Sequence, residues 1–192
     1  MGKSVFQHAD FLNGARTLIR EHGPNAVTLD SLTRMLGAPK GSFYHRFESR
    51  DALMGQLWLS AVRSYQEGFV AAIEAGNGLA AALHTPSWSR ANLTDACLLL
   101  LYSRHDFVEG DWPADLKRGV DEQKRQVEKC MELFARRQFG RAGTTQIKCA
   151  TFVLLEAPIA AVKEYLRRRE PPAAVVDKLI TRTYDAIVTP AE

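Results

Sequence analysis

The sequence has few cysteines and no long apolar run. Its three cysteines, Cys97, Cys130 and Cys149, are widely spaced and form no Cys-x-x-Cys pair, so neither a disulfide framework nor a structural zinc site is expected. No stretch of about 18 uninterrupted apolar residues occurs, which argues against a membrane-spanning helix. The N-terminus lacks the charged, apolar and small-residue pattern of a secretory signal. These absences predict a cytoplasmic protein that holds no metal.

Catalytic motifs are also missing. The chain contains no Gly-x-Ser-x-Gly, no His-Glu-x-x-His and no phosphate-binding P-loop, the short patterns that mark hydrolases, metalloenzymes and nucleotide-binding enzymes. We therefore expect neither enzymatic activity nor a cofactor. An all-helical enzyme that uses a C-terminal cavity is the weakest of the alternatives, and a positioned acid–base pair in that cavity would favour it.

Positive and negative side chains nearly balance over most of the chain. The net charge is only +3 for 192 residues. Residues 1–50 contain seven Lys or Arg and four Asp or Glu, so the whole positive excess lies in the first quarter of the sequence. This distribution predicts a modest electrostatic footprint for phosphate near the N-terminus.

Apolar residues recur at helical spacing along the chain, and no segment alternates with a period of two. Together with a hydrophobic fraction of 46%, this pattern predicts an all-α fold of about nine helices. We expect a helix-turn-helix domain at residues 1–48 and a larger helical domain at 49–192. The expected helices span about 4–22, 29–36, 39–46, 50–75, 79–84, 91–104, 113–138, 145–168 and 172–188.

The last two helices contain the most continuous apolar surface. Between Cys149 and Val162 only Thr151 and Glu156 are polar, and a helix that is apolar all round must be covered all round. The final helix offers a second apolar face. The pair predicts a dimer interface that forms a four-helix bundle with a second copy, the alternative being that both helices are central in a monomer.

Residues 28–47 have the pattern of a helix-turn-helix. Thr28 is a suitable N-cap, Gly37 suits a left-handed turn, and Pro39 suits the start of a second short helix. Phe43 and Phe47 are predicted to anchor this second helix. The remaining side chains and the helix starts suit phosphates and base edges. The candidate DNA-binding residues are Thr28, Lys40, Gly41, Ser42, Tyr44, His45, Arg46 and Arg50.

This segment resembles the N-terminal domain of the tetracycline-repressor (TetR-like) family over about residues 6–57. The family pattern has a central Ala in the first helix, a Gly-rich break, a capping Thr, a Gly turn and a Lys-Gly-Thr/Ser-aromatic-Tyr-x-x-Phe run. The matching positions are Ala15, Gly23, Thr28, Gly37, Lys40 to Phe47 and Ser49 to Leu53. The sequence departs from the pattern at Thr33, Leu36, Ala38, Pro39 and Arg50, of which Pro39 removes a hydroxyl from the turn.

The resemblance implies a homodimer that places two recognition helices in successive major grooves of a palindromic operator. It also implies a C-terminal domain whose small-molecule effector opposes DNA binding, which makes the protein a ligand-released repressor. The alternatives are control by a protein partner or by thiol oxidation.

The candidate pocket residues are mostly large and aromatic, and most of them are expected to be ordinary core. Tyr102 and His105 are the expected polar groups, three residues apart near a helix end. The full set is Trp58, Tyr65, Phe69, Tyr102, His105, Phe107, Trp112, Met131, Phe134 and Phe152.

Overall fold

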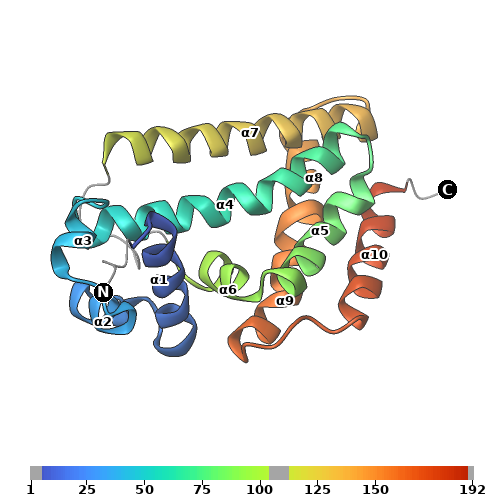
Figure 1. The fold of residues 1–192 in the computed structure, drawn as a ribbon. Coiled ribbons are helices and arrows are strands. Elements are labelled where there is room, and N and C mark those ends of the chain that lie inside the picture. The colour runs from blue at the N-terminus through green and yellow to red at the C-terminus, as the bar shows by residue number, and fades with distance from the viewer. Residues whose placement is uncertain (1–5, 104–112, 190–192) are drawn as a thin grey trace.

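The computed structural model describes residues 6–103 and 113–189. These residues form nine helices, counting the continuous segment 144–167 once, and no strand (Figure 1), which confirms the predicted all-α fold. The first elements are α1 (His8–His22), a 3-10 turn (Pro24–Ala26), α2 (Leu29–Leu36) and α3 (Lys40–Tyr44). The others are α4 (Arg50–Glu74), α5 (Gly78–Ala91), α6 (Leu93–Leu101), α7 (Ala114–Phe139), α8 (Thr144–Thr151), a π-helical turn (Phe152–Glu156), α9 (Ala157–Arg167) and α10 (Val175–Val188).

The first three helices form a compact head around an aromatic cluster. Phe11, Phe43 and Phe47 are almost completely buried, and the ring of Phe11 meets the other two edge-on at 5.7 and 6.1 Å between centroids. The same core continues into α4, α6 and α7 through residues such as Leu57 and Leu98. The head is therefore packed onto the rest of the molecule rather than tethered to it.

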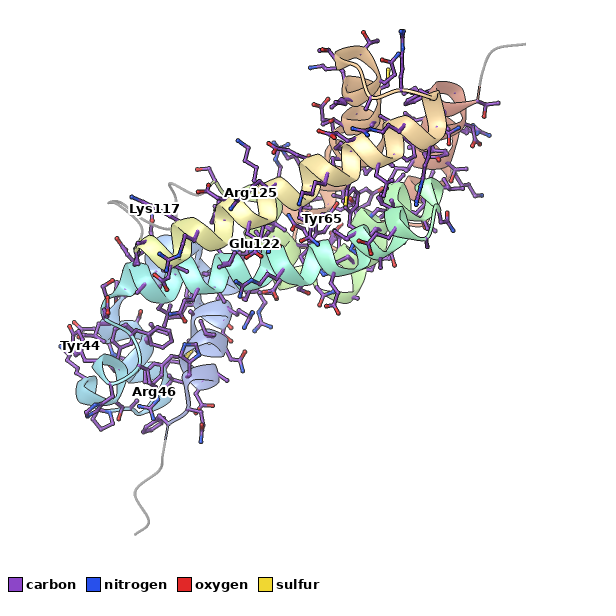
Figure 2. The ribbon with its side chains drawn as sticks, turned by 90° about the horizontal axis from the view of Figure 1, so that it is seen from above. Tyr44, Arg46, Tyr65, Lys117, Glu122 and Arg125 are labelled. Atoms are coloured by element: carbon purple, nitrogen blue, oxygen red, sulfur yellow. The ribbon has the colours of Figure 1, made fainter. Side chains whose placement is uncertain are left out.

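Helices α4 and α7 run parallel along the length of the molecule (Figures 1 and 2). Near their starts, the side chain of Leu59 on α4 packs over the bare backbone of Gly119 on α7. Near their ends, Arg137 Nη1 donates to the carbonyl of Ile73 at 2.8 Å. Since α4 begins directly after α3 and ends among the C-terminal helices, it connects the head to the body.

The body is a second core built from α4, α5, α6, α7 and the C-terminal helices. Its central side chains include Tyr65, Phe69, Met131 and Phe134, each at most 7% exposed. The Tyr65 hydroxyl lies 2.8 Å from Thr85 Oγ1, which satisfies a phenol that would otherwise be buried without a partner. Burial raises the pKa of Tyr65 to about 12, so this residue is a neutral core side chain.

The sequence expectation of a break before Pro86 is wrong. Pro86 lies inside the continuous helix α5, although an interior proline removes one helix hydrogen bond and typically costs about 3 kcal/mol. Pro86 is buried, and Ala82, Trp88 and Ser89 around it are buried as well. Tertiary burial outweighs the local preference here, as it often does for helical segments.

The long C-terminal helix contains a π turn between α8 and α9. The N–H of Ala157 bonds to the carbonyl of Phe152, five residues back, and Pro158 follows at once with no N–H to give. A π turn changes the direction of the side chains that follow it. Phe152 is 43% exposed, so the apolar surface of this helix is only partly covered.

The helix Thr144–Arg167 is the one helix in the described part of the chain that is long and apolar enough to cross a membrane. Core helices of soluble proteins meet the same criterion of length and composition. This helix packs against α5, α6 and α10. Val175 and Leu179 of α10 are also largely exposed, at 51% and 53%. The C-terminal helices, which carry these exposed apolar side chains, lie at the end of the molecule away from the head (Figure 1).

Helix α10 begins at Val175, three residues later than the expected start at Pro172. The guanidinium of Arg90 donates to the carbonyls of Pro172 and Ala173 at 2.8 and 3.2 Å. It also pairs with Asp177 at 2.9 Å. These contacts anchor the proline-containing connection to α5, and α10 starts after it.

Candidate DNA-binding surface and ligand cavity

The turn between α2 and α3 is built by local signals in the sequence. Thr28 caps α2, with its hydroxyl accepting from the Ser31 backbone N–H at 3.0 Å. Gly37 ends α2 with φ 64°, in the left-handed region that favours glycine. Both features agree with the sequence prediction. The Thr28 hydroxyl is exposed but already engaged as the cap, so a phosphate at this position would be met mainly by backbone N–H groups.

Helix α3 has five residues, shorter than the expected 39–46, and cannot be stable alone. Phe43 and Phe47 are 1% and 2% exposed, and their rings stack at 5.4 Å between centroids. Both rings contact Phe11 of α1. Tertiary packing on α1 therefore holds α3 in place, as the spacing of the two phenylalanines predicts.

The opposite side of α3 faces solvent. Lys40, Gly41, Tyr44 and His45 are exposed, and Ser42 is half-buried. Tyr44 is 59% exposed while its ring leans edge-on against Phe43 at 5.5 Å, which keeps a large hydrogen-bonding side chain outward at small entropic cost. A Cβ added to Gly41 would meet nothing within 4 Å. Figure 2 shows Tyr44 and Arg46 on the head, at the end of the molecule opposite the C-terminal helices.

Lys40 has a partner within the head that the sequence reading did not identify. Its Nζ lies 2.7 Å from Asp30 Oδ1 of α2, and both side chains are exposed. The hydrogen bond and the opposite charge raise the pKa of Lys40 and lower the pKa of Asp30. A DNA phosphate would have to compete with Asp30 for this ammonium group, so Asp30 belongs to the electrostatics of the surface.

Two of the candidate arginines make contacts within the head. Arg46 Nη1 donates to the carbonyl of Ser42 at 2.8 Å. Arg50 Nε donates to the carbonyl of Val27 at 2.6 Å, and its Nη2 donates to that of Pro24 at 3.2 Å. Arg50 thus ties the connection between α1 and α2 to the start of α4. Its planar fork suits this role, which a lysine would not reproduce.

A cavity of about 330 Å³ lies where the head meets the body. Helix α6 lies between α1 and the end of α9 (Figure 1), and the cavity opens between these three elements. Its volume is at the lower end of the range of about 300–1,000 Å³ typical of ligand pockets. The cavity is lined by Ile19, Arg20, Leu93, Thr94, Cys97, Leu101, Tyr102, Leu166, Arg167 and Arg169.

Tyr102 is the member of the predicted pocket set that lines this cavity. Tyr65, Phe69, Met131 and Phe134 are used in the body core. Trp58 packs against the head core, and Phe152 is exposed. The described members of this set do not gather in one pocket, because most of them pack into the hydrophobic cores. His105, Phe107 and Trp112 lie outside the described residues.

The head and body are joined beside this cavity by an ion pair that sequence spacing did not suggest. Arg16 Nε of α1 donates to Asp95 Oδ1 of α6 at 2.8 Å, and its Nη2 donates to Ser60 Oγ of α4 at 3.0 Å. On the other side of the cavity, Arg169 Nη1 donates to the carbonyl of Glu21 at 3.2 Å. These partners lie 79 and 148 residues apart in the chain, so only the fold brings them together.

A second hollow, larger and shallower, follows the seam between α4 and α7. Charged side chains of both signs line it, including Arg63, Glu74, Arg118 and Glu122. A ligand site usually combines an enclosed apolar wall with a few polar groups. The cavity between α1, α6 and α9 meets that description better.

The fold and the α2–turn–α3 geometry define a helix-turn-helix DNA-binding protein with a helical C-terminal body. Residues 11–57 match the family model described as bacterial regulatory proteins, tetR family. The match covers α1 to the first part of α4, so the chain contains a DNA-binding domain of the tetR type.

Solved structures of low sequence identity share the fold over nearly the whole chain. The transcriptional regulator FadR from Bacillus subtilis, solved in complex with stearoyl-CoA, is 11% identical with a TM-score of 0.67, over 97% of this chain and 100% of that one. A tetR-family regulator from Shewanella sp. PV-4 is 16% identical with a TM-score of 0.63, and the match covers 94% of this chain and 95% of that one. The reduced form of NemR from E. coli is 17% identical with a TM-score of 0.60, and the match covers 96% of this chain and 99% of that one. No curated protein sequence matches the chain.

Proposed function

We propose that this protein is a homodimeric repressor that binds a palindromic operator through α3 and is released by a small molecule. The observation that carries the proposal is the position of the cavity, which is walled by α1 of the head and by α6 and α9 of the body. A ligand there contacts both parts at once. It would therefore change the position of the head relative to the body and oppose DNA binding.

We place the boundary between the two domains at residues 48 and 49, where α3 gives way to the cap of α4. The presence of two buried clusters supports this division, one in the head and one in the body. The head cluster includes side chains from α4, α6 and α7. Movement of α6 or α4 would thus be transmitted to the recognition helix by direct packing.

The dimer is supported by three exposed apolar side chains on the C-terminal helices. Phe152, Val175 and Leu179 are all between 43% and 53% exposed, and exposed apolar patches of this kind mark protein interfaces. We expect Leu179→Lys to shift the protein toward monomer in analytical ultracentrifugation. Arg125→Ala, an exposed change on α7, is the control. A monomeric parent protein, or a dimer that tolerates Leu179→Lys and Phe152→Lys together, would contradict this interface.

Control by a small molecule is favoured over control by thiol oxidation. Burial raises the pKa of Cys97 and of Cys130, and a thiol with a raised pKa contains less of the reactive thiolate. The cavity, in contrast, offers a ready site for a ligand. We find no feature in the described residues that specifically favours a protein partner.

DNA binding is tested by fluorescence anisotropy on the DNA that flanks the protein's own gene. Binding should weaken steeply as salt rises, with a log–log slope of about −0.9 for each phosphate contact. Tyr44→Ala and Lys40→Ala should each reduce affinity, and Lys40→Ala should also make the slope shallower. Lys178→Ala, in an exposed position on α10, is the matched control. Unchanged affinity in both head variants would contradict the assignment of α3.

A further inference from the structure

We infer that the cavity between α1, α6 and α9 binds an anionic amphiphile, a molecule with an apolar chain and a carboxylate or phosphate group. The inference rests on the proposed function, because it names the chemical class of the effector. The walls of the cavity, the cations around it and the backbone at its edge all favour such a ligand.

The walls of the cavity are mainly apolar. Ile19 of α1, Leu93 and Leu101 of α6 and Leu166 of α9 line it. The half-buried thiol of Cys97 behaves as a small apolar group. A ligand that fills this space must bring apolar surface of its own, since burying unpaired polar groups against such walls is costly.

Three arginines, Arg20, Arg167 and Arg169, line the same cavity. Arg20 approaches Glu21 at 3.3 Å and Arg167 approaches Glu164 at 3.6 Å, and all four side chains are about half exposed or more. Ion pairs of this kind on the surface are weak. A ligand anion held over the apolar wall can therefore compete for these guanidinium groups, which bind carboxylate and phosphate in a bidentate manner.

Arg169 occupies a backbone position at which glycine is the usual residue. Arg169 has φ 58° and is the one non-glycine residue with positive φ in the described chain. It follows the C-cap of α9, and the bonds from its N–H to Leu166 and from Glu170 to Tyr165 form a Schellman motif, where glycine is the common residue. The guanidinium of Arg169 donates to the Glu21 carbonyl of α1 at 3.2 Å, so this cavity residue already contacts the head. Its charge also acts on Cys97 in the wall, where it lowers the thiol pKa against the larger effect of burial.

The arginines come from both sides of the junction between head and body. Arg20 belongs to α1, whereas Arg167 is the last residue of α9 and Arg169 follows the C-cap of that helix. An anion bound between them would connect the two parts through charge-assisted hydrogen bonds. The apolar chain would meanwhile lie against α6. This arrangement explains how one ligand could act on the head without contacting α2 or α3.

The test compares octanoate, octyl phosphate, 1-octanol and octylamine by isothermal titration calorimetry on the full-length protein. We expect both anions to bind at least tenfold more tightly than 1-octanol, and octylamine to bind most weakly. The ratio of octanoate to octyl phosphate affinity distinguishes a carboxylate from a phosphate ligand. Equal affinity for octanoate and 1-octanol would overturn the inference.

Substitutions then locate the anion. Arg169→Asn removes the charge but keeps a residue that tolerates the left-handed conformation, and we expect it to weaken octanoate binding about tenfold, or about 1.4 kcal/mol. Arg20→Gln should have a similar effect. Arg168→Gln is the matched control, because Arg168 pairs with Glu164 and Glu170 and does not line the cavity. Equal losses in Arg168→Gln and Arg169→Asn would overturn the assignment.

Adding the same ligands to the complex of the protein with DNA distinguishes the anion site from the release of DNA by a ligand. Octanoate that binds and lowers DNA affinity supports both. Octanoate that binds at the arginines without affecting DNA affinity supports the anion site and contradicts release by this cavity. Release of DNA by 1-octanol, with no binding of octanoate, leaves the ligand-released regulator in place and overturns the anionic class.

Discussion

The ion pair between Arg16 and Asp95 should stabilise the junction of head and body by a measurable amount. Their side chains are 26% and 17% exposed, so the pair is screened less than a surface pair. Arg16 also donates to Ser60. Hydrogen bonds to charged groups contribute about 1.5–3 kcal/mol, and we expect Arg16→Met or Asp95→Asn to reduce the free energy of unfolding by about 2 kcal/mol.

A double-mutant cycle isolates the contribution of the pair from that of each side chain. We expect a coupling energy of about 1–2 kcal/mol between Arg16 and Asp95. The surface pair Glu132–Arg136, at 3.1 Å and four residues apart on α7, is the control and should give about 0.3–0.5 kcal/mol. Unfolding is followed by circular dichroism in urea at one fixed protein concentration, since the proposed dimerisation would make the apparent stability depend on concentration.

A coupling energy between Arg16 and Asp95 no larger than that of the surface pair would refute the reasoning. It would show that the junction depends on apolar packing of α1 against α6 rather than on this contact. If the coupling is as expected, Arg16→Met should also weaken the effect of the ligand on DNA affinity, because the ion pair connects the head to the helix that lines the cavity.

Three further predictions concern single residues. Gly41→Ala should leave the free energy of unfolding unchanged or raise it by about 0.5–1 kcal/mol, since the added Cβ meets nothing within 4 Å. The same substitution should weaken DNA binding if α3 approaches the DNA closely. Equal DNA affinity in the variant and the parent protein would contradict that close approach. Phe43→Ala should reduce the free energy of unfolding by about 3–5 kcal/mol. Phe152→Ala, at a 43% exposed position, should have little effect on the stability of the monomer. Similar losses at both positions would contradict the assigned burial. Because burial raises the pKa of Tyr65 from 10.0 to about 12 in the folded protein, its contribution to stability should be fully present below about pH 10 and lost as pH rises to 12, by roughly 3 kcal/mol. Tyr65→Phe should flatten this part of the stability–pH curve measured by urea unfolding, and an unchanged slope would show that another group titrates.

The helix-turn-helix was predictable because its determinants are local. A capping threonine, a glycine at the left-handed turn and two phenylalanines four residues apart each act within one or two helical turns. The structure places all of these as the spacing predicts. The boundaries of α4 and α7 were predicted within one or two residues for the same reason, since caps and glycines mark their ends.

The parts that were mispredicted depend on contacts between distant segments. Pro86 would end an isolated helix, but burial within the body keeps α5 continuous. The start of α10 depends on Arg90, more than 80 residues away in the chain. The role of Arg50 in tying the carbonyls of Val27 and Pro24 to the start of α4 likewise joins distant segments, and its contact with a DNA phosphate stays a prediction.

The sequence by itself determined that the chain is all-helical and that residues 28–47 form a DNA-binding motif, because helical periodicity and turn chemistry are encoded over short distances. Only the tertiary structure decided where the cavity forms that we propose as the ligand site. The cavity joins Arg20, Cys97 and Arg169 from three separate segments of the chain, and no periodicity in the chain connects them. Tyr65, Phe69 and Phe134, three of the aromatic residues proposed for a pocket, lie in the body core, since burying the largest apolar surfaces stabilises the fold most.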